Sequence, residues 1–194
     1  GFASACEFEV AEQTESRVTF VLRDNEVTRA QFPFAFLFKV RYALKESTVE
    51  VTYTVDNPED EMLHFGLGGH PGFNVPLKEG TSFEDYYLRF SQPCEPDRVG
   101  FSSEILVSGV DKRYELEGGQ IIRLRHDLFD HDAIVLKNMA KSVTIASDKT
   151  KRYVTVSYPQ MPYVGFWHAE RKDAPYVCIE PWVSLPARDG GVED

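Results

Sequence analysis

Two neighbouring stretches of the chain alternate strictly between apolar and polar side chains. Within residues 33–43 every second side chain is apolar, namely Phe34, Phe36, Phe38, Val40 and Tyr42. Residues 48–55 repeat the pattern with Val49, Val51, Tyr53 and Val55. A period of two places each apolar set on one face of a β-strand. Because only Lys45-Glu46-Ser47 separates the two stretches, we predict an antiparallel hairpin with one buried face.

The rest of the chain adds short strand candidates and no amphipathic helix longer than a turn or two. We expect about twelve strands in all, and the clearest of the others are residues 5–12, 16–23, 86–90, 112–116, 120–124, 133–137, 142–146, 153–158 and 176–180. Gly118-Gly119 should form a hairpin turn, and residues 126–132 a single helical turn. Residues 91–103 and 159–165 contain prolines and glycine and are expected to be loops. This spacing of strands predicts one all-β domain over residues 1–194, an antiparallel β-sandwich or a barrel.

Composition excludes several classes of protein. The 194 residues are 42% hydrophobic and 13% aromatic, which excludes an intrinsically disordered chain. The net charge of −10 argues against binding nucleic acid or an anionic membrane surface through bulk electrostatics. No apolar run approaches the roughly 18–20 residues that a transmembrane helix needs. We therefore expect neither nucleic acid nor a membrane as a partner.

The cysteines indicate a reducing compartment. Cys6, Cys94 and Cys178 are odd in number, far apart in the sequence and without a CxxC pair. This pattern predicts free thiols, no disulfide within the chain and a cytoplasmic location. The same spacing does not predict a structural zinc site.

One histidine lies in a stretch rich in backbone-breaking residues. Residues 65–74 read Phe-Gly-Leu-Gly-Gly-His-Pro-Gly-Phe-Asn, so we expect regular strand pairing to stop there. Glycine allows positive φ and a close approach of the backbone to a ligand, and Pro71 stiffens the chain directly after His70. An imidazole held in this way suits proton transfer near neutral pH. A tight turn with an exposed histidine is the alternative interpretation.

A carboxylate closes the last predicted strand. Residues 176–182 read Tyr-Val-Cys-Ile-Glu-Pro-Trp. A glutamate at the end of a buried strand, beside a large aromatic ring, is poorly solvated, and its pKa should rise as suits a general base. We predict that His70 and Glu180 face one cleft on the concave side of a sheet, about 5–8 Å apart, so that both reach one ligand. The alternative is that Glu180 only ends a strand beside Trp182.

Three motifs in this order resemble the aldose 1-epimerase (galactose mutarotase) family, in particular its bacterial LacX-like branch. They are Gly68-Gly69-His70-Pro71-Gly72-Phe73-Asn74, Phe129-Asp130-His131-Asp132-Ala133 and Val177-Cys178-Ile179-Glu180-Pro181-Trp182. The first and the last are moderately specific together, since either alone would be a weak signal. The similarity runs along nearly the whole chain.

The resemblance implies a fold, a reaction and a set of roles. The fold would be the large antiparallel sandwich called a supersandwich, or galactose mutarotase-like. The reaction would interconvert the α and β anomers of a free aldose without cofactor or metal. His70 would then protonate the ring oxygen, and Glu180 would take the proton of the anomeric hydroxyl. Asp132, or Asp130 if the alignment slips by two residues, would hold sugar hydroxyls together with Asn74 and Trp182.

The resemblance also bears on the start of the chain. Family members have another histidine, and an arginine earlier still, before the position that matches Gly1, and they continue with a further strand beyond Asp194. We therefore expect that part of the family's sugar pocket is not encoded in these residues, and that the domain is incomplete at the N-terminus.

Other polar residues have simpler interpretations. His64 is expected on a strand surface, His126 and His131 in a polar loop, and His168 in a solvated loop, with the sugar pocket as its alternative position. Trp182 and Phe73 are candidates for a platform beneath the sugar, although ordinary core positions suit both residues equally well.

Three functions fit these observations. The first is an aldose mutarotase acting on a small-molecule sugar, with a homodimer left open. The second is a non-catalytic carbohydrate-binding module on the same sandwich. The third is a hexose-6-phosphate mutarotase, which needs a cationic cluster for the phosphate, for which Arg123, Arg125 and Arg171 are the candidates.

Overall fold

The structure is a computed structural model, and it describes residues 1–191. Fourteen strands, all in antiparallel sheets, and only short helices make up this part of the chain, so the predicted all-β class is confirmed. The chain divides into two compact units, residues 1–65 and residues from 66 onward. The expectation of one domain over residues 1–194 remains a prediction. Among residues 1–191, no helix is long and apolar enough to cross a membrane.

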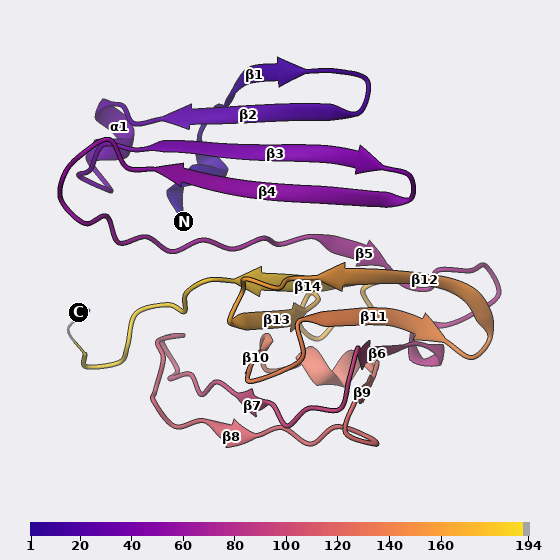
Figure 1. The fold of residues 1–194 in the computed structure, drawn as a ribbon. Coiled ribbons are helices and arrows are strands. Elements are labelled where there is room, and N and C mark those ends of the chain that lie inside the picture. Colours follow the sequence, from indigo (N-terminus) through magenta and orange to yellow (C-terminus); the bar gives the residue numbers. More distant parts are fainter. Residues whose placement is uncertain (192–194) are drawn as a thin grey trace. The chain divides into compact units, whose positions relative to one another are not determined.

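The first unit is a four-stranded antiparallel meander (Figure 1). Its elements are the 3-10 helix Phe2–Ala5, β1 (Glu9–Gln13), β2 (Arg17–Arg23), α1 (Glu26–Arg29), β3 (Leu37–Lys45) and β4 (Thr48–Asp56). Asn25 caps α1 by accepting from the backbone N–H groups of Val27 and Thr28. The register pairs Phe38 with Val55 and Val40 with Tyr53, so the predicted antiparallel hairpin is confirmed. Its first strand begins only at Leu37, and its apolar face is buried only in part, because Tyr42, Val49 and Val51 are exposed.

The second unit contains a six-stranded and a four-stranded sheet. The six-stranded sheet has the order β5-β14-β13-β10-β7-β8, and its strands are β5 (Gly72–Asn74), β7 (Asp97–Arg98), β8 (Lys112–Arg113), β10 (Ile134–Lys137), β13 (Tyr163–Trp167) and β14 (Tyr176–Trp182). The four-stranded sheet has the order β12-β11-β6-β9, with β6 (Tyr87–Phe90), β9 (Ile121–Arg123), β11 (Ser142–Ser147) and β12 (Thr150–Ser157). Two 3-10 helices, Phe83–Asp85 and His126–Phe129, connect strands.

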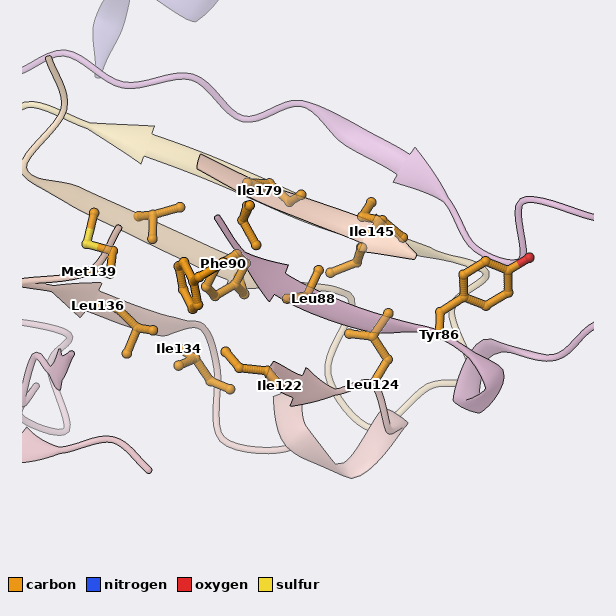
Figure 2. Packing of buried hydrophobic residues seen from close by; sticks show 14 of the residues in the cluster. Tyr86, Leu88, Phe90, Ile122, Leu124, Ile134, Leu136, Met139, Ile145 and Ile179 are labelled. Carbon is orange, nitrogen blue, oxygen red and sulfur yellow. The ribbon is translucent and has the colours of Figure 1, made fainter. Parts of the chain in front are cut away.

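The main hydrophobic core lies between these two sheets. The six-stranded sheet contributes buried side chains such as Leu136, Phe166 and Ile179, and the four-stranded sheet contributes Leu88 and Phe90. Figure 2 shows Leu88, Phe90, Leu136 and Ile179 packing between the strands. The rings of Phe90 and Phe166 meet edge to face with centroids 6.1 Å apart. This packing confirms the predicted antiparallel sandwich.

Several local predictions need correction. Residues 159–165 were expected to be a loop, but β13 begins at Tyr163 and lies between β14 and β10. The expected loop 91–103 likewise contains β7. The single helical turn expected within residues 126–132 is present as the 3-10 helix His126–Phe129. Gly118 and Gly119 form a turn with positive φ, but the expected hairpin of the strands on either side is not formed, because β8 and β9 belong to different sheets. All three cysteines are free, as predicted.

Candidate active site

Alternation along β14 determines which of its side chains leave the core. Val177 and Ile179 belong to the main hydrophobic core, so Cys178 and Glu180 lie on the opposite face of the six-stranded sheet. Glu180 is only 4% exposed. Burial raises the pKa of the Glu180 carboxyl above its ordinary value, His70 opposes this shift, and Asp132 adds to it. The expected rise in the pKa of this carboxylate is therefore present, and its main cause is desolvation.

The glycine-rich segment runs alongside β14. Gly68 forms an isolated bridge with Trp182, and the backbone N–H of Gly69 donates to the carbonyl of Pro181 at 3.0 Å. The N–H of Ile179 in turn donates to the carbonyl of Pro71 at 3.1 Å. Regular strand pairing stops in residues 65–71, as expected, and only this isolated bridge and single backbone hydrogen bonds continue alongside β14. These bonds bring His70 beside the end of β14.

Glycine is needed in this segment for close packing and not for positive φ. None of its glycines is among those with positive φ. A Cβ on Gly68 would lie 2.4 Å from Cδ1 of Trp182, which is closer than any side chain permits. The indole ring thus occupies the space that a side chain at position 68 would take. The close approach that we expected for a ligand is made by Trp182.

His70 and Glu180 meet in the structure. The distance from His70 Nε2 to Glu180 Oε1 is 3.3 Å, and the His70 side chain remains 60% exposed. Oε1 is buried and has no hydrogen-bond partner among the described residues, so the two atoms lie within ion-pair distance without a hydrogen bond. The prediction of one shared cleft is confirmed, but the separation of about 5–8 Å was too long.

A pocket of about 940 Å³ opens in front of this pair. Its lining includes His70, Glu180, Asp132, Trp167 and Trp182. This volume lies within the range of small-molecule sites, roughly 300–1,000 Å³. The ring of Trp167 meets that of His70 edge to face, with centroids 5.6 Å apart. An imidazole, a carboxylate and two indoles therefore surround one open space, a combination that suits a polar ligand with apolar faces.

Asp132 takes an unusual backbone conformation where it borders the pocket. Its φ is 71°, in the left-handed region that residues other than glycine rarely adopt and that is enriched at functional sites. Its Oδ1 accepts from the N–H of Ala133 at 2.7 Å. Asp132, our first choice for the sugar-contacting aspartate, lines the pocket, whereas Asp130 is not among its lining residues.

The remaining predicted sugar contacts divide between the pocket and other surfaces. Trp182 lines the pocket and also packs on a small apolar cluster formed by Val99, Val107 and Val135. Asn74 is exposed on β5 and does not line the pocket. Phe73 packs against the main core instead of the pocket, which is its ordinary structural role. The roles assigned to these residues remain predictions.

His168 is the clearest correction among the histidines. It is neither solvated nor part of the pocket lining, because its side chain is fully buried. Its Nδ1 donates to the carbonyl of Ala169 at 2.8 Å, and burial lowers the pKa of its imidazole. Its Nε2 lies 3.1 Å from His126 Nδ1. Since a neutral His168 has no proton left on Nε2, His126 must donate this hydrogen bond.

The other histidines lie at the surface. His126 stacks on Phe83 with ring centroids 4.1 Å apart. His131 is exposed and lines the pocket, although we had placed it in an unremarkable polar loop. His64 is exposed as expected, but it lies outside any strand.

Two residues on β13, one beside Glu180 and one in the pocket wall, were missed from the sequence. Gly165 lies directly opposite Glu180 in the strand register, and a Cβ there would lie 3.3 Å from Cζ2 of Trp182 and 3.4 Å from Glu180 Cβ. Trp167 forms part of the pocket wall. A glycine flanked by apolar residues within Tyr163-Val-Gly-Phe-Trp167 was the available signal, since such a glycine often marks a close approach in a strand.

The candidate phosphate cations are not gathered at the pocket. Arg123 pairs with Glu117, and Arg125 pairs with Asp127. Neither of these arginines, nor Arg171, lines the pocket. The cationic cluster required by the hexose-6-phosphate hypothesis is therefore not formed by these three residues.

Comparison with known proteins identifies the family. The sequence profile described as aldose 1-epimerase matches residues 1–185. The chain belongs to the aldose 1-epimerase family. Within that family it is LacX-like, since it is 32% identical over 189 residues to the chromosomal LacX protein of Lactococcus lactis subsp. lactis. The matched residues cover 95% of this chain and 62% of LacX.

Solved structures agree with this family assignment. A galactose mutarotase related enzyme from Lactobacillus acidophilus is 36% identical, with a TM-score of 0.89 over 98% of this chain and 64% of that protein. A galactose mutarotase-like protein from Lactobacillus casei ATCC 334 is 33% identical, with a TM-score of 0.82 over 94% of this chain and 64% of that protein. The chain thus spans somewhat less than two thirds of the length of these relatives.

Proposed function

We propose that this protein is a mutarotase, which interconverts the α and β anomers of a free aldose by general acid–base catalysis. The observation that carries the proposal is the pairing of His70 Nε2 and Glu180 Oε1, 3.3 Å apart, at one pocket. Membership of the aldose 1-epimerase family supports it.

The chemistry requires two proton transfers at one carbon. Glu180, as the carboxylate, takes the proton from the O1 hydroxyl, and His70, as the imidazolium, gives a proton to the ring oxygen O5. The C1–O5 bond breaks, C1 becomes an aldehyde, and the sugar is open. Rotation about C1–C2 and attack by the O5 hydroxyl on the other face of the aldehyde return both protons. Because O1 and O5 are bonded to the same carbon, an acid and a base that lie next to each other can serve both.

The surroundings of the pair support each step. The raised pKa of Glu180 makes its carboxylate a stronger base than an exposed glutamate. The indoles of Trp167 and Trp182 offer apolar surfaces for the C–H faces of a sugar, and Asp132 offers an acceptor for a hydroxyl. No redox or group-transfer step occurs, so acid–base groups are sufficient for the whole reaction.

The deciding experiment is polarimetry on freshly dissolved α-anomer with Glu180→Gln. Turnover should fall by at least about 100-fold, the lower range for a lost general base, while sugar binding changes much less. His70→Asn should have a similar effect, and the two losses should not add fully, since both groups act in one event. Glu117→Gln, at an exposed carboxylate paired with Arg123, is the matched control and should leave turnover unchanged.

The opposite outcomes are equally clear. Near-normal turnover in a well-folded Glu180→Gln variant would show that Glu180 is not the base. A wild-type chain that binds sugar without accelerating the decay of optical rotation would favour the non-catalytic binding module. Parallel assays with glucose and its 6-phosphate test the third candidate.

The pH dependence of turnover gives a second check. Turnover should fall on the acid side as Glu180 becomes protonated, and the midpoint of this fall should lie above 4.5, the ordinary value, because burial raises the pKa of this carboxyl. An acid midpoint at or below the ordinary value would contradict the assignment.

The expected location and partners are part of the same proposal. The free thiols of Cys6, Cys94 and Cys178 support a reducing compartment, and we propose the cytoplasm. A small-molecule sugar is the proposed partner, with no nucleic acid and no membrane, and a homodimer is left open.

A further inference from the structure

Three different metal-ligating side chains converge where His70 meets β14. One ligand atom from each of His70, Cys178 and Glu180 lies within 4.8 Å of the other two. Cys178 and Glu180 are 4% exposed, whereas His70 is open to the pocket. The mechanism uses the imidazole and the carboxylate, but it gives the thiol no task.

We propose that His70, Cys178 and Glu180 form a binding site for a thiophilic divalent transition-metal ion, with Zn²⁺ as the test case. Such an ion would occupy the acid and the base at once, and so would block the proton transfers. The binding claim stands by itself, whereas the inhibition claim rests on the proposed mutarotase function.

The three ligand types at this place suit a thiophilic metal ion. An imidazole nitrogen, a thiolate sulfur and a carboxylate oxygen are the three ligand types that zinc takes in proteins. A thiolate among them favours Zn²⁺ over Mg²⁺ or Ca²⁺, which prefer oxygen alone. Three protein ligands with a fourth position left open is the arrangement of zinc sites that exchange ligands. Here the fourth position would face the pocket.

The distances between the ligand atoms are close to those of a tetrahedral zinc site. With Zn–N and Zn–O bonds of about 2.0–2.1 Å, the N···O edge of a tetrahedron is about 3.3 Å. His70 Nε2 and Glu180 Oε1 are 3.3 Å apart. A sulfur at about 2.3 Å from the metal needs edges of about 3.6 Å. Since the ligand atoms lie within 4.8 Å of one another, an adjustment of at most about 1.2 Å brings Cys178 into range. His70 lies on an exposed segment between the isolated bridge at Gly68 and the start of β5 at Gly72. An adjustment of the backbone is least costly in such a segment.

One oxygen of the Glu180 carboxylate is without a hydrogen-bond partner among the described residues. This oxygen, Oε1, is also buried, an arrangement that is rare in folded proteins and requires an explanation. A sugar hydroxyl during turnover satisfies this oxygen, and a metal ion would satisfy it equally well. The two occupants would therefore compete for the same atom.

Binding of the ion would also displace a proton. Burial raises the pKa of the Cys178 thiol to about 11, and Glu180 adds to the shift, so the free thiol carries its proton at neutral pH. The metal replaces this proton, a sulfur–metal bond forms, and one proton leaves to the buffer. No oxidant or reductant takes part.

The test is a titration of the chelator-treated chain with Co²⁺, followed by its absorption spectrum. A thiolate-to-cobalt charge-transfer band, with the intense visible bands of a four-coordinate ion, should appear and saturate at one equivalent. Cys178→Ser should abolish the charge-transfer band and weaken binding by about 100-fold or more, above the usual effect of changing a ligand's neighbour. Cys94→Ser and Cys6→Ser are the matched controls and should keep both the charge-transfer band and the affinity for the ion.

Each contrary result overturns the site. Absence of the band in the wild-type chain, or its persistence in Cys178→Ser, would show that these three side chains do not bind the ion together. The cobalt spectrum can be measured on an inactive protein, so this test is independent of the proposed function.

Inhibition is measured separately by polarimetry. Zn²⁺ at one equivalent should suppress mutarotation in the wild-type chain, EDTA should restore it, and the ratio of activity with and without Zn²⁺ should return close to one in Cys178→Ser. A chain that shows the cobalt bands but no mutarotase activity under any condition would retain the metal site and lose the proposed function.

Discussion

The two units of the chain bury their apolar side chains in different ways. In residues 1–65 a single sheet carries one apolar face, and the most buried apolar side chain there is Leu22, which is still 3% exposed. From residue 66 onward two sheets enclose a shared core, and the twelve largest fully buried side chains, among them Phe90, Phe129 and Phe166, all lie there. The lesson is that clear alternation marks a half-buried sheet, whereas the tightest packing lies where alternation is weak.

The largest expected effect tests this difference in packing. Phe166→Ala, at a fully buried position of β13, should lower the free energy of unfolding by about 3–5 kcal/mol. Phe38→Ala, at a position 8% exposed on β3, should cost at least about 1 kcal/mol less, since its site can relax more easily. Chemical denaturation measures both, and Phe→Leu at the same two positions keeps the comparison measurable if an Ala variant does not fold. Equal losses of unfolding free energy in the two Ala variants would contradict this difference in packing between the two units.

A smaller effect is expected where backbone and indole touch. Gly68→Ala would place a Cβ 2.4 Å from Trp182, and should cost about 1–3 kcal/mol through overpacking. Gly72→Ala is the matched control, because its Cβ would meet the Cys178 sulfur at an ordinary 3.6 Å. Melting curves of both variants provide the measurement. A Gly68→Ala variant as stable as Gly72→Ala would show that Trp182 can move aside.

The smallest effect concerns pH. Burial lowers the pKa of His168 below its ordinary value of 6.5, so the unfolded chain takes up this proton before the folded chain does. Stability should therefore fall as the pH drops below about 6.5, with a slope from this group of at most about 1.4 kcal/mol per pH unit. His168→Gln should reduce the slope, while His64→Gln, at an exposed position of the first unit, should keep that of the wild-type chain. Equal slopes in all three would contradict the buried neutral imidazole.

The same contrast explains what could be predicted from the sequence. β3 and β4 were found because only one of their faces is apolar, which leaves a period of two. β13 was missed because Val164, Gly165 and Phe166 are all buried, and because the preceding prolines suggested a loop. A strand buried on both faces has no alternation to detect.

That His70 and Glu180 meet was easier to predict than how they meet. The proton roles expected of an imidazole and a poorly solvated carboxylate pointed to this pair, although 110 positions separate the two residues. Their distance, the place of Cys178 beside them and the burial of His168 depend on contacts between strands that are remote in sequence. No local pattern encodes those contacts, so only the three-dimensional structure reveals them.

The positions of the indole rings give the protein a built-in optical reporter. The chain has two tryptophans, and both Trp167 and Trp182 line the pocket. Intrinsic fluorescence excited at the indole band therefore comes only from the pocket wall, and the first unit contributes none. A sugar or a metal ion entering the pocket should change the intensity or the emission maximum, and occupancy can then be followed in real time without a label.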